Sequence, residues 1–105
     1  MANPLRFHPM VADDLAIATE WYDSISIGLG NRFRQAVDSQ LDAVELRPQS
    51  FAATEGAMRP ARIKRFPYLI VYELTDVSIE VLGVFHTASE REKWHRRQQT
   101  GKNAE

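Results

Sequence analysis

The stretch YLIVYELTDVSIEVLGVFH, from Tyr68 to His86, decides the fold of this chain. It contains two runs rich in β-branched and aromatic residues, 68–74 and 78–86, which predict two strands, and the TDV between them predicts a hairpin turn. The second run divides into two alternating sets, Ile79, Val81, Gly83 and Phe85 on one face and Glu80, Leu82, Val84 and His86 on the other. Because both faces are largely apolar, we expect this strand to be central in a sheet.

The segments on either side of this hairpin predict a further strand and a short helix. Residues 62–65 begin a strand that Phe66-Pro67 interrupts, since proline cannot donate to a sheet ladder. Residues 48–60 have neither helical nor strand periodicity and predict a loop. After the hairpin, Ser89 and Glu92 have the spacing of a capping box, which predicts a helix from Glu90 to about Arg97. We expect residues 98–105 to form a flexible tail.

The N-terminal half predicts one strand and two helices. Residues 5–8 alternate like a strand, and Pro9 suits the first turn of a helix. Apolar residues then recur at helical spacing in two segments: Val11, Leu15, Ala18 and Tyr22, with Ala12 and Trp21 widening the stripe, and then Phe33, Val37, Leu41 and Val44. Gly28 and Gly30 separate the segments, and Asn31 is the predicted cap of the second helix. The order is therefore β-α-α-β-β-β-α, an α+β domain with a helical hairpin packed on a small antiparallel sheet.

Composition limits the classes of protein to which this chain can belong. Its 105 residues suit one domain, which we place at residues 1–97. The absence of cysteine excludes disulfides and thiolate metal sites. The three histidines have no ligand-like spacing, so we expect neither a metal nor a cofactor. The sequence has no signal-peptide pattern and no membrane-length apolar run, which favours a cytoplasmic protein without a membrane partner.

The net charge of −1 hides a division along the chain. Acidic residues dominate between Met10 and Arg47. Cations gather in two places, at Arg59, Arg62, Lys64 and Arg65, and at Arg91, Lys93, Arg96, Arg97 and Lys102. A divided surface of this kind can steer an anionic partner to one face. The simpler interpretation is that these side chains are solvated surface.

Three blocks of the sequence resemble the RelE/ParE superfamily of bacterial type II toxins. They are WYDSISIGLGNRFRQAV from Trp21, RIKRFPYLIVYE from Arg62 and VLGVFHTASEREKW ending at Trp94. The resemblance covers nearly the whole chain and implies a small toxin that a cognate antitoxin holds inactive. A double-stranded-RNA-binding domain also has three consecutive strands, but it would have one helix before them, not two. A non-toxic binding module that keeps the fold is the alternative, because fold does not fix function.

The superfamily contains two kinds of toxin, and the residues favour neither decisively. RelE-like members cut messenger RNA on the ribosome, whereas ParE-like members poison DNA gyrase. RelE-like toxins typically carry an arginine after the first tyrosine of the third strand, where this chain has Leu69. By resemblance His86 is a candidate for proton transfer, and Arg65 could replace the lost charge.

The cations near these residues are further candidates for binding. The resemblance assigns Arg62, Lys64, Arg91 and Lys93 to RNA or target binding, and Arg59, Arg62, Lys64 and Arg65 to antitoxin binding. Trp94 could stack on a base, although packing of the terminal helix over the sheet is the commoner role of a large aromatic residue.

Overall fold

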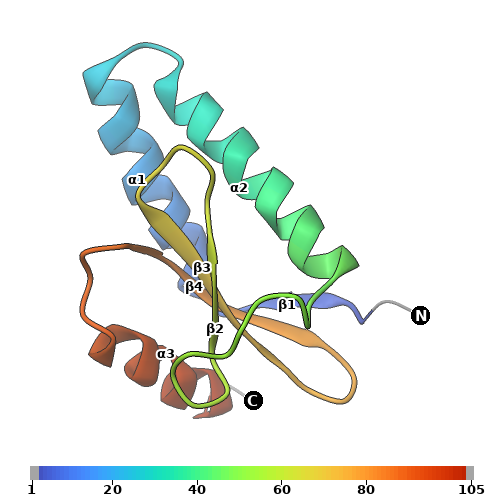
Figure 1. Cartoon of the computed structure of the whole chain (residues 1–105). Helices are drawn as coiled ribbons and strands as arrows, with labels where there is room; N and C mark the ends of the chain where they lie inside the picture. The colour runs from blue at the N-terminus through green and yellow to red at the C-terminus, as the bar shows by residue number, and fades with distance from the viewer. Residues whose placement is uncertain (1–2, 104–105) are drawn as a thin grey trace.

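The computed structural model describes residues 3–103, and its elements follow the predicted β-α-α-β-β-β-α order (Figure 1). The elements are β1 (Leu5–Phe7), α1 (Val11–Ile25), α2 (Leu29–Leu46), β2 (Arg59–Arg62), β3 (Tyr68–Leu74), β4 (Ile79–His86) and α3 (Glu92–Asn103). The α1–α2 hairpin covers one face of the sheet and α3 lies against the other. No helix within residues 3–103 is long and apolar enough to span a membrane.

The sheet is antiparallel as predicted except at β1, whose parallel pairing makes it mixed. Its strand order is β1-β4-β3-β2, which confirms that β4 is central. β2 and β3 pair antiparallel, as do β3 and β4, but β1 runs parallel to β4. Parallel neighbours need a long crossover connection, and here the crossover is the whole chain between β1 and β4. A three-residue edge strand carries too little local pattern to specify such a distant partner.

A β-bulge in β4 changes which side chains share a face. Val71 pairs with Gly83 and Tyr72 pairs with Val81, so Leu82 is an extra residue in the ladder. Beyond the bulge the alternation shifts, and Phe85 packs with Leu82 on the α3 face. The predicted grouping of Phe85 with Ile79 and Val81 is therefore wrong.

Two hydrophobic clusters pack the helices against the two faces of the sheet. The larger cluster lies between the helical hairpin and the sheet. There the rings of Tyr22 and Phe33 contact each other, and each contacts Phe66 and Tyr68, with centroids 5.0–6.0 Å apart. The smaller one, on the α3 face, consists of Met58, Val71, Leu82, Phe85 and Trp94, with Leu69 packed against it. Trp94 is buried there, which confirms that it packs the terminal helix over the sheet.

The helical hairpin differs from the prediction at the N-terminal cap of α2 and at Trp21 of α1. α2 is preceded by Gly28, which has a φ of 86°, and Asn31 lies inside the helix rather than at its cap. The N–H of Gly30 instead donates to Asp23 Oδ1 at 2.8 Å, so a side chain of α1 satisfies a free amide of α2. Trp21 does not widen the buried stripe, because 57% of it is exposed.

The terminal helix begins later and ends later than predicted. The carbonyl of Arg91 accepts the first helical bond, from the N–H of His95, so Arg91 and not Ser89 precedes the helix. The predicted capping box is therefore wrong. Residues 98–103 are helical where a flexible tail is expected, and Ala104 and Glu105 lie outside the described residues.

Candidate functional site

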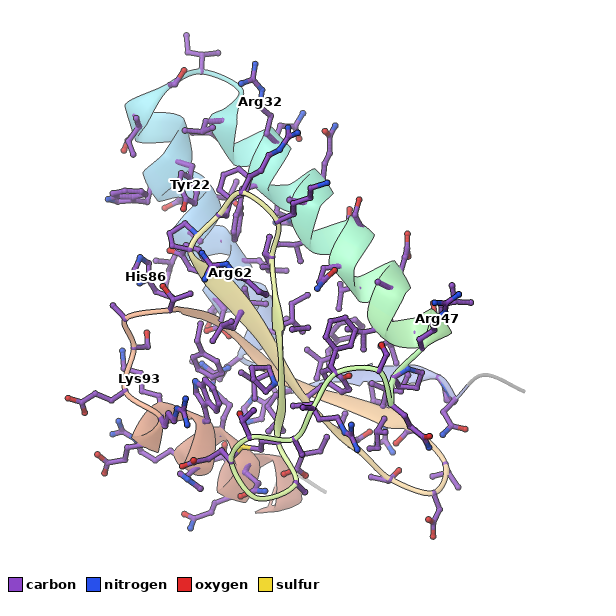
Figure 2. The ribbon with its side chains drawn as sticks, viewed as in Figure 1. Tyr22, Arg32, Arg47, Arg62, His86 and Lys93 are labelled. Atoms are coloured by element: carbon purple, nitrogen blue, oxygen red, sulfur yellow. The ribbon has the colours of Figure 1, made fainter. Side chains whose placement is uncertain are left out.

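A groove of about 320 Å³ lies where the end of β4 and the start of β3 meet α1 and α3. α1 lines it with Ile17 and Ala18, the strands with Tyr68 and His86, and α3 with Lys93 and Arg96. Figure 2 shows His86 at the end of its strand and Lys93 on the helix below it. Two of the predicted site residues, His86 and Lys93, are thus brought together.

An ion pair between α1 and α3 forms one side of the groove. Both guanidinium Nη atoms of Arg97 donate to the carboxylate of Asp14 at 2.8 Å. These side chains are only 15% and 13% exposed. Because Asp14 neutralises Arg97, this arginine offers little charge to a ligand. The sequence did not indicate Asp14 as a site residue, because it lies 83 residues from its partner.

The same pair satisfies backbone groups beside the β-bulge. Asp14 Oδ2 accepts the N–H of Val84 at 3.1 Å, and Arg97 Nη1 donates to the carbonyl of Leu82 at 2.9 Å. Gly83 leaves room for this approach: a Cβ there would lie 2.7 Å from Arg97 Nη1 and 2.5 Å from Phe85 Cζ, so a larger residue would force these side chains to shift. The positions of the β-bulge, the Asp14–Arg97 ion pair and Gly83 therefore depend on one another.

His86 is an exposed histidine at the end of β4. Its Nδ1 accepts the N–H of Ala88 at 3.0 Å, and its ring stands edge-on to Tyr68 with centroids 5.2 Å apart. None of the ion pairs within residues 3–103 includes His86. Burial raises the pKa of the Tyr68 hydroxyl, so this phenol stays protonated near neutral pH. It can therefore donate a hydrogen bond but is a poor base.

The cations of α3 and Arg91, which precedes the helix, differ in their side-chain contacts. Lys93 and Arg96 are exposed, line the groove and form no ion pair within the described part of the chain. Arg91 lies 3.5 Å from Glu55, whose other carboxylate oxygen is 2.9 Å from His95 Nε2. The hydrogen bond from His95, together with the charges of His95 and Arg91, lowers the pKa of Glu55, although desolvation opposes them. Arg91 therefore connects α3 to the loop after α2.

Arg65 and Lys64 lie in a turn, not in a strand. β2 ends at Arg62, and Arg65 adopts a φ of 72°, an unusual value for a residue other than glycine. Both side chains line a second cavity of about 560 Å³, together with Arg32 and Phe66, against α2. His86 does not line this cavity, so the proposed catalytic pair of His86 and Arg65 is divided between two cavities.

The predicted basic cluster is likewise divided. The guanidinium of Arg59 donates to the carbonyls of Phe51 and Gln49 and so holds the loop before β2. Arg62 is exposed on the edge strand, and its carbonyl accepts a 2.9 Å hydrogen bond from Gln40 of α2. Only Arg62, Lys64 and Arg65 of the four present exposed side chains.

Leu69 stands where RelE-like toxins typically carry an arginine. It pairs with Phe85 of β4 and packs against the cluster of Met58, Val71, Leu82, Phe85 and Trp94. The position is therefore part of the contact between the sheet and α3. It supplies no charge to the groove.

The structure resembles a solved toxin complex. A chain of the chromosomal ParDE toxin–antitoxin system from P. aeruginosa matches with a TM-score of 0.72 at 16% identity, over 81% of this chain and 96% of that one. This likeness defines the RelE/ParE-like fold.

Relatives by sequence give the family. No family model matches the chain. The ParE2 toxins of two Mycobacterium tuberculosis strains are 30% identical over 87 residues, which cover 82% of this chain and 83% of the relatives. The chain therefore belongs to the ParE family, within the RelE/ParE superfamily, and is the toxin of a type II toxin–antitoxin module.

Proposed function

We propose that this toxin arrests growth by binding DNA gyrase in the cytoplasm and does not cut RNA. The observation that carries the proposal is the place of Leu69 in the α3 cluster. Cleavage at a 2′-hydroxyl needs cations around the developing charge of the phosphate, a base and a leaving-group acid. An apolar side chain at this position cannot stabilise that charge, and Leu69 instead packs, partly buried, against the α3 cluster.

The surroundings of His86 support the same proposal. Within residues 3–103 no carboxylate forms a hydrogen bond or ion pair with it. Arg97, whose side chain is only 15% exposed, is already neutralised by Asp14. Arg65 lines another cavity. Lys93 and Arg96 remain as exposed cations on the wall of the groove, an arrangement that suits recognition of an acidic surface more than preorganised catalysis.

Two measurements on the wild-type toxin and one variant test this proposal. We expect purified toxin to inhibit gyrase supercoiling, and we expect transcript ends mapped after induction to contain no new cleavage sites. His86→Ala should arrest growth as the wild type does. New transcript ends that disappear in His86→Ala would establish a nuclease instead, and normal growth on strong induction would favour a non-toxic binding module.

We also propose that a cognate antitoxin neutralises the exposed cations of the β2–β3 hairpin. Arg62, Lys64 and Arg65 have no acidic neighbour in sequence, and the cavity beside Lys64 and Arg65 has apolar lining from Leu29, Ala36 and Phe66. An antitoxin segment with both carboxylates and apolar side chains would complement this surface. Arg59 is left out of this proposal because backbone carbonyls already occupy its guanidinium.

Charge reversal tests the antitoxin surface. The double variant Arg62→Glu/Arg65→Glu should bind the antitoxin more slowly and with weaker salt dependence, because charge steers association. Arg34→Glu/Arg47→Glu, which changes two exposed cations of α2 and its C-terminal end, is the matched control. Unchanged association at low salt in the first variant would place the antitoxin elsewhere.

A further inference from the structure

A row of exposed apolar side chains runs along α1 beside the groove. Ile17, Trp21 and Ile25 are four residues apart, so they lie on one side of the helix, and they are 70%, 57% and 57% exposed. Ile27, in the following turn, is fully exposed. Ile17 itself lines the groove. The row therefore extends the groove along α1 toward the tip of the helical hairpin.

The fold uses little of this row, although the ring of Trp21 stands edge-on to that of Tyr22 with centroids 5.1 Å apart. α1 packs on the sheet and on α2 through Val11, Ala18 and Tyr22, which are buried. A contiguous exposed apolar surface commonly marks a place where another molecule binds. Trp21 is the best anchor in the row, because tryptophan is enriched among the residues that dominate binding energy.

The opposite wall of the groove is cationic. Lys93 and Arg96 project from α3, whereas Arg97 between the walls is neutralised by Asp14. An occupant of the groove therefore meets apolar side chains on the α1 side. On the α3 side it meets two positive charges that form no ion pair within residues 3–103. The complementary surface is apolar on one flank and carries carboxylates on the other.

We propose that this groove, from Ile17, Trp21 and Ile25 to Lys93 and Arg96, docks an acidic amphipathic segment of the protein target. This inference rests on the proposed function, since it assigns the surface through which the toxin would hold gyrase. A segment with apolar residues at helical spacing fits along the row, which spans about 12 Å between Ile17 and Ile25 at 1.5 Å per helical residue.

Other occupants fit the groove less well. A nucleic acid would present phosphates to both walls, and the α1 wall offers them no cation beside Ile17 and Ala18. A second copy in a two-fold dimer would set the same patch on both sides of the interface, so both pairs of groove cations would enter one contact. A protein segment with carboxylates satisfies both walls at once.

Two variants and two matched controls test the groove. Trp21→Ser removes the apolar anchor, and Lys93→Glu/Arg96→Glu reverses the cationic wall. Val77→Ser, at a residue 70% exposed in the β3–β4 turn, controls for loss of an exposed apolar side chain, and Arg34→Glu/Arg47→Glu controls for charge. All four proteins are measured for gyrase binding, growth arrest and binding to the cognate antitoxin, with circular dichroism to check that each is folded.

We expect Trp21→Ser to weaken gyrase binding by at least about tenfold and to abolish growth arrest. The charge reversal should slow association by about tenfold, and both controls should behave as the wild type does. Ile17→Ser is the second apolar variant and serves if Trp21→Ser is unfolded. Antitoxin binding should persist in both groove variants.

Four results would overturn the inference. Wild-type gyrase binding by Trp21→Ser and Ile17→Ser would show that the row is not the docking surface. Loss of antitoxin binding with retained gyrase binding would assign the groove to the antitoxin, and dimers lost only in Trp21→Ser would assign it to a second copy. If the wild-type toxin does not bind gyrase, the proposed function fails. Growth arrest then tests the groove separately, and unaltered arrest by Trp21→Ser would refute its role as a docking surface.

Discussion

The two faces of the sheet are held by different kinds of interaction. The α1–α2 hairpin packs through a broad apolar core that includes Phe33, Tyr72 and the aromatic rings around them. α3 is a polar helix that buries Trp94 and is otherwise tied by side-chain contacts such as Arg97 with Asp14 and His95 with Glu55. Hydrophobic burial is nearly independent of pH, whereas ionised contacts are not. The hairpin should thus resist changes of pH that loosen α3.

This difference between the two faces of the sheet affects the groove, because one wall of the groove is formed by α1 and the other by α3. The α1 wall is fixed by the main core, but the position of Lys93 and Arg96 depends on the contacts that dock α3. Changes that weaken α3 should therefore alter the groove while the rest of the fold persists. Changes in the core of the hairpin face should unfold the protein as a whole.

The largest expected effect is on the hairpin face. Phe33 has no exposed surface and contacts Tyr22, Phe66 and Tyr68. Phe33→Ala should lower the free energy of unfolding by about 3–5 kcal/mol, because it removes a buried ring and leaves a cavity. Denaturant unfolding measures this loss, with the exposed Val77→Ala as control. A loss below about 1 kcal/mol would contradict the view that this cluster carries the stability of the fold.

The second effect concerns the ion pair that docks α3. Arg97→Met leaves the largely buried carboxylate of Asp14 without its partner and should cost about 3 kcal/mol. Asp14→Asn/Arg97→Met should recover part of that loss, since it removes the uncompensated charge. The exposed pair of Arg6 and Glu80, 3.8 Å apart, supplies the control: Arg6→Met should cost less than about 1 kcal/mol. Equal losses from Arg97→Met and Arg6→Met would mean that burial of the first pair has no energetic consequence.

The sequence predicts the hairpin face well because that face is built from periodic apolar segments. The spacing of Phe33, Val37 and Val44 indicates one side of a helix, and all three are buried. The β-rich run 68–74 coincides with β3, and the two apolar faces of the last strand correctly indicate a central strand. Local pattern and tertiary packing agree in these elements.

The α3 face and the groove depend on contacts that no local pattern encodes. Asp14 and Arg97 are ordinary charges in the sequence, and only the fold brings them together beside the bulge at Leu82, where they also bond backbone groups. Lys64 and Arg65 look like strand residues, but the Phe66-Pro67 pair moves the turn onto them. The candidate site was therefore predictable as residues on α3 and β4, but not as a cavity with an apolar wall on α1.

A smaller effect should follow from the contact between Glu55 and His95. The pKa of Glu55 lies below its ordinary value near 4.5, chiefly because His95 donates a hydrogen bond to the carboxylate. The stabilisation that the ionised Glu55 contributes is fully present above the pKa of this group in the unfolded state. It is lost as pH falls through the lower pKa of the folded state. Thermal unfolding midpoints of the wild type and Glu55→Gln should therefore converge as pH falls from 6 to about 3. A constant difference across that range would show that the carboxylate charge does not hold the loop to α3.

The smallest expected effect is at His8, which joins the end of β1 to α3. Its Nε2 lies 2.8 Å from Thr100 Oγ1, and its Nδ1 accepts the N–H of Met10 at 3.0 Å, which requires an unprotonated Nδ1. Burial and the charge of Arg97 lower the pKa of His8 below 6.5, although Asp14 opposes them. The neutral ring therefore stabilises the fold above about pH 6.5, and this contribution is lost as pH falls through the lower folded pKa. His8→Asn keeps an acceptor for the N–H of Met10 but cannot titrate, so the stability of the wild type should fall more steeply than that of the variant between pH 7 and about 5. Parallel stability curves would mean that His8 is solvated in the folded state and that α3 is docked without it.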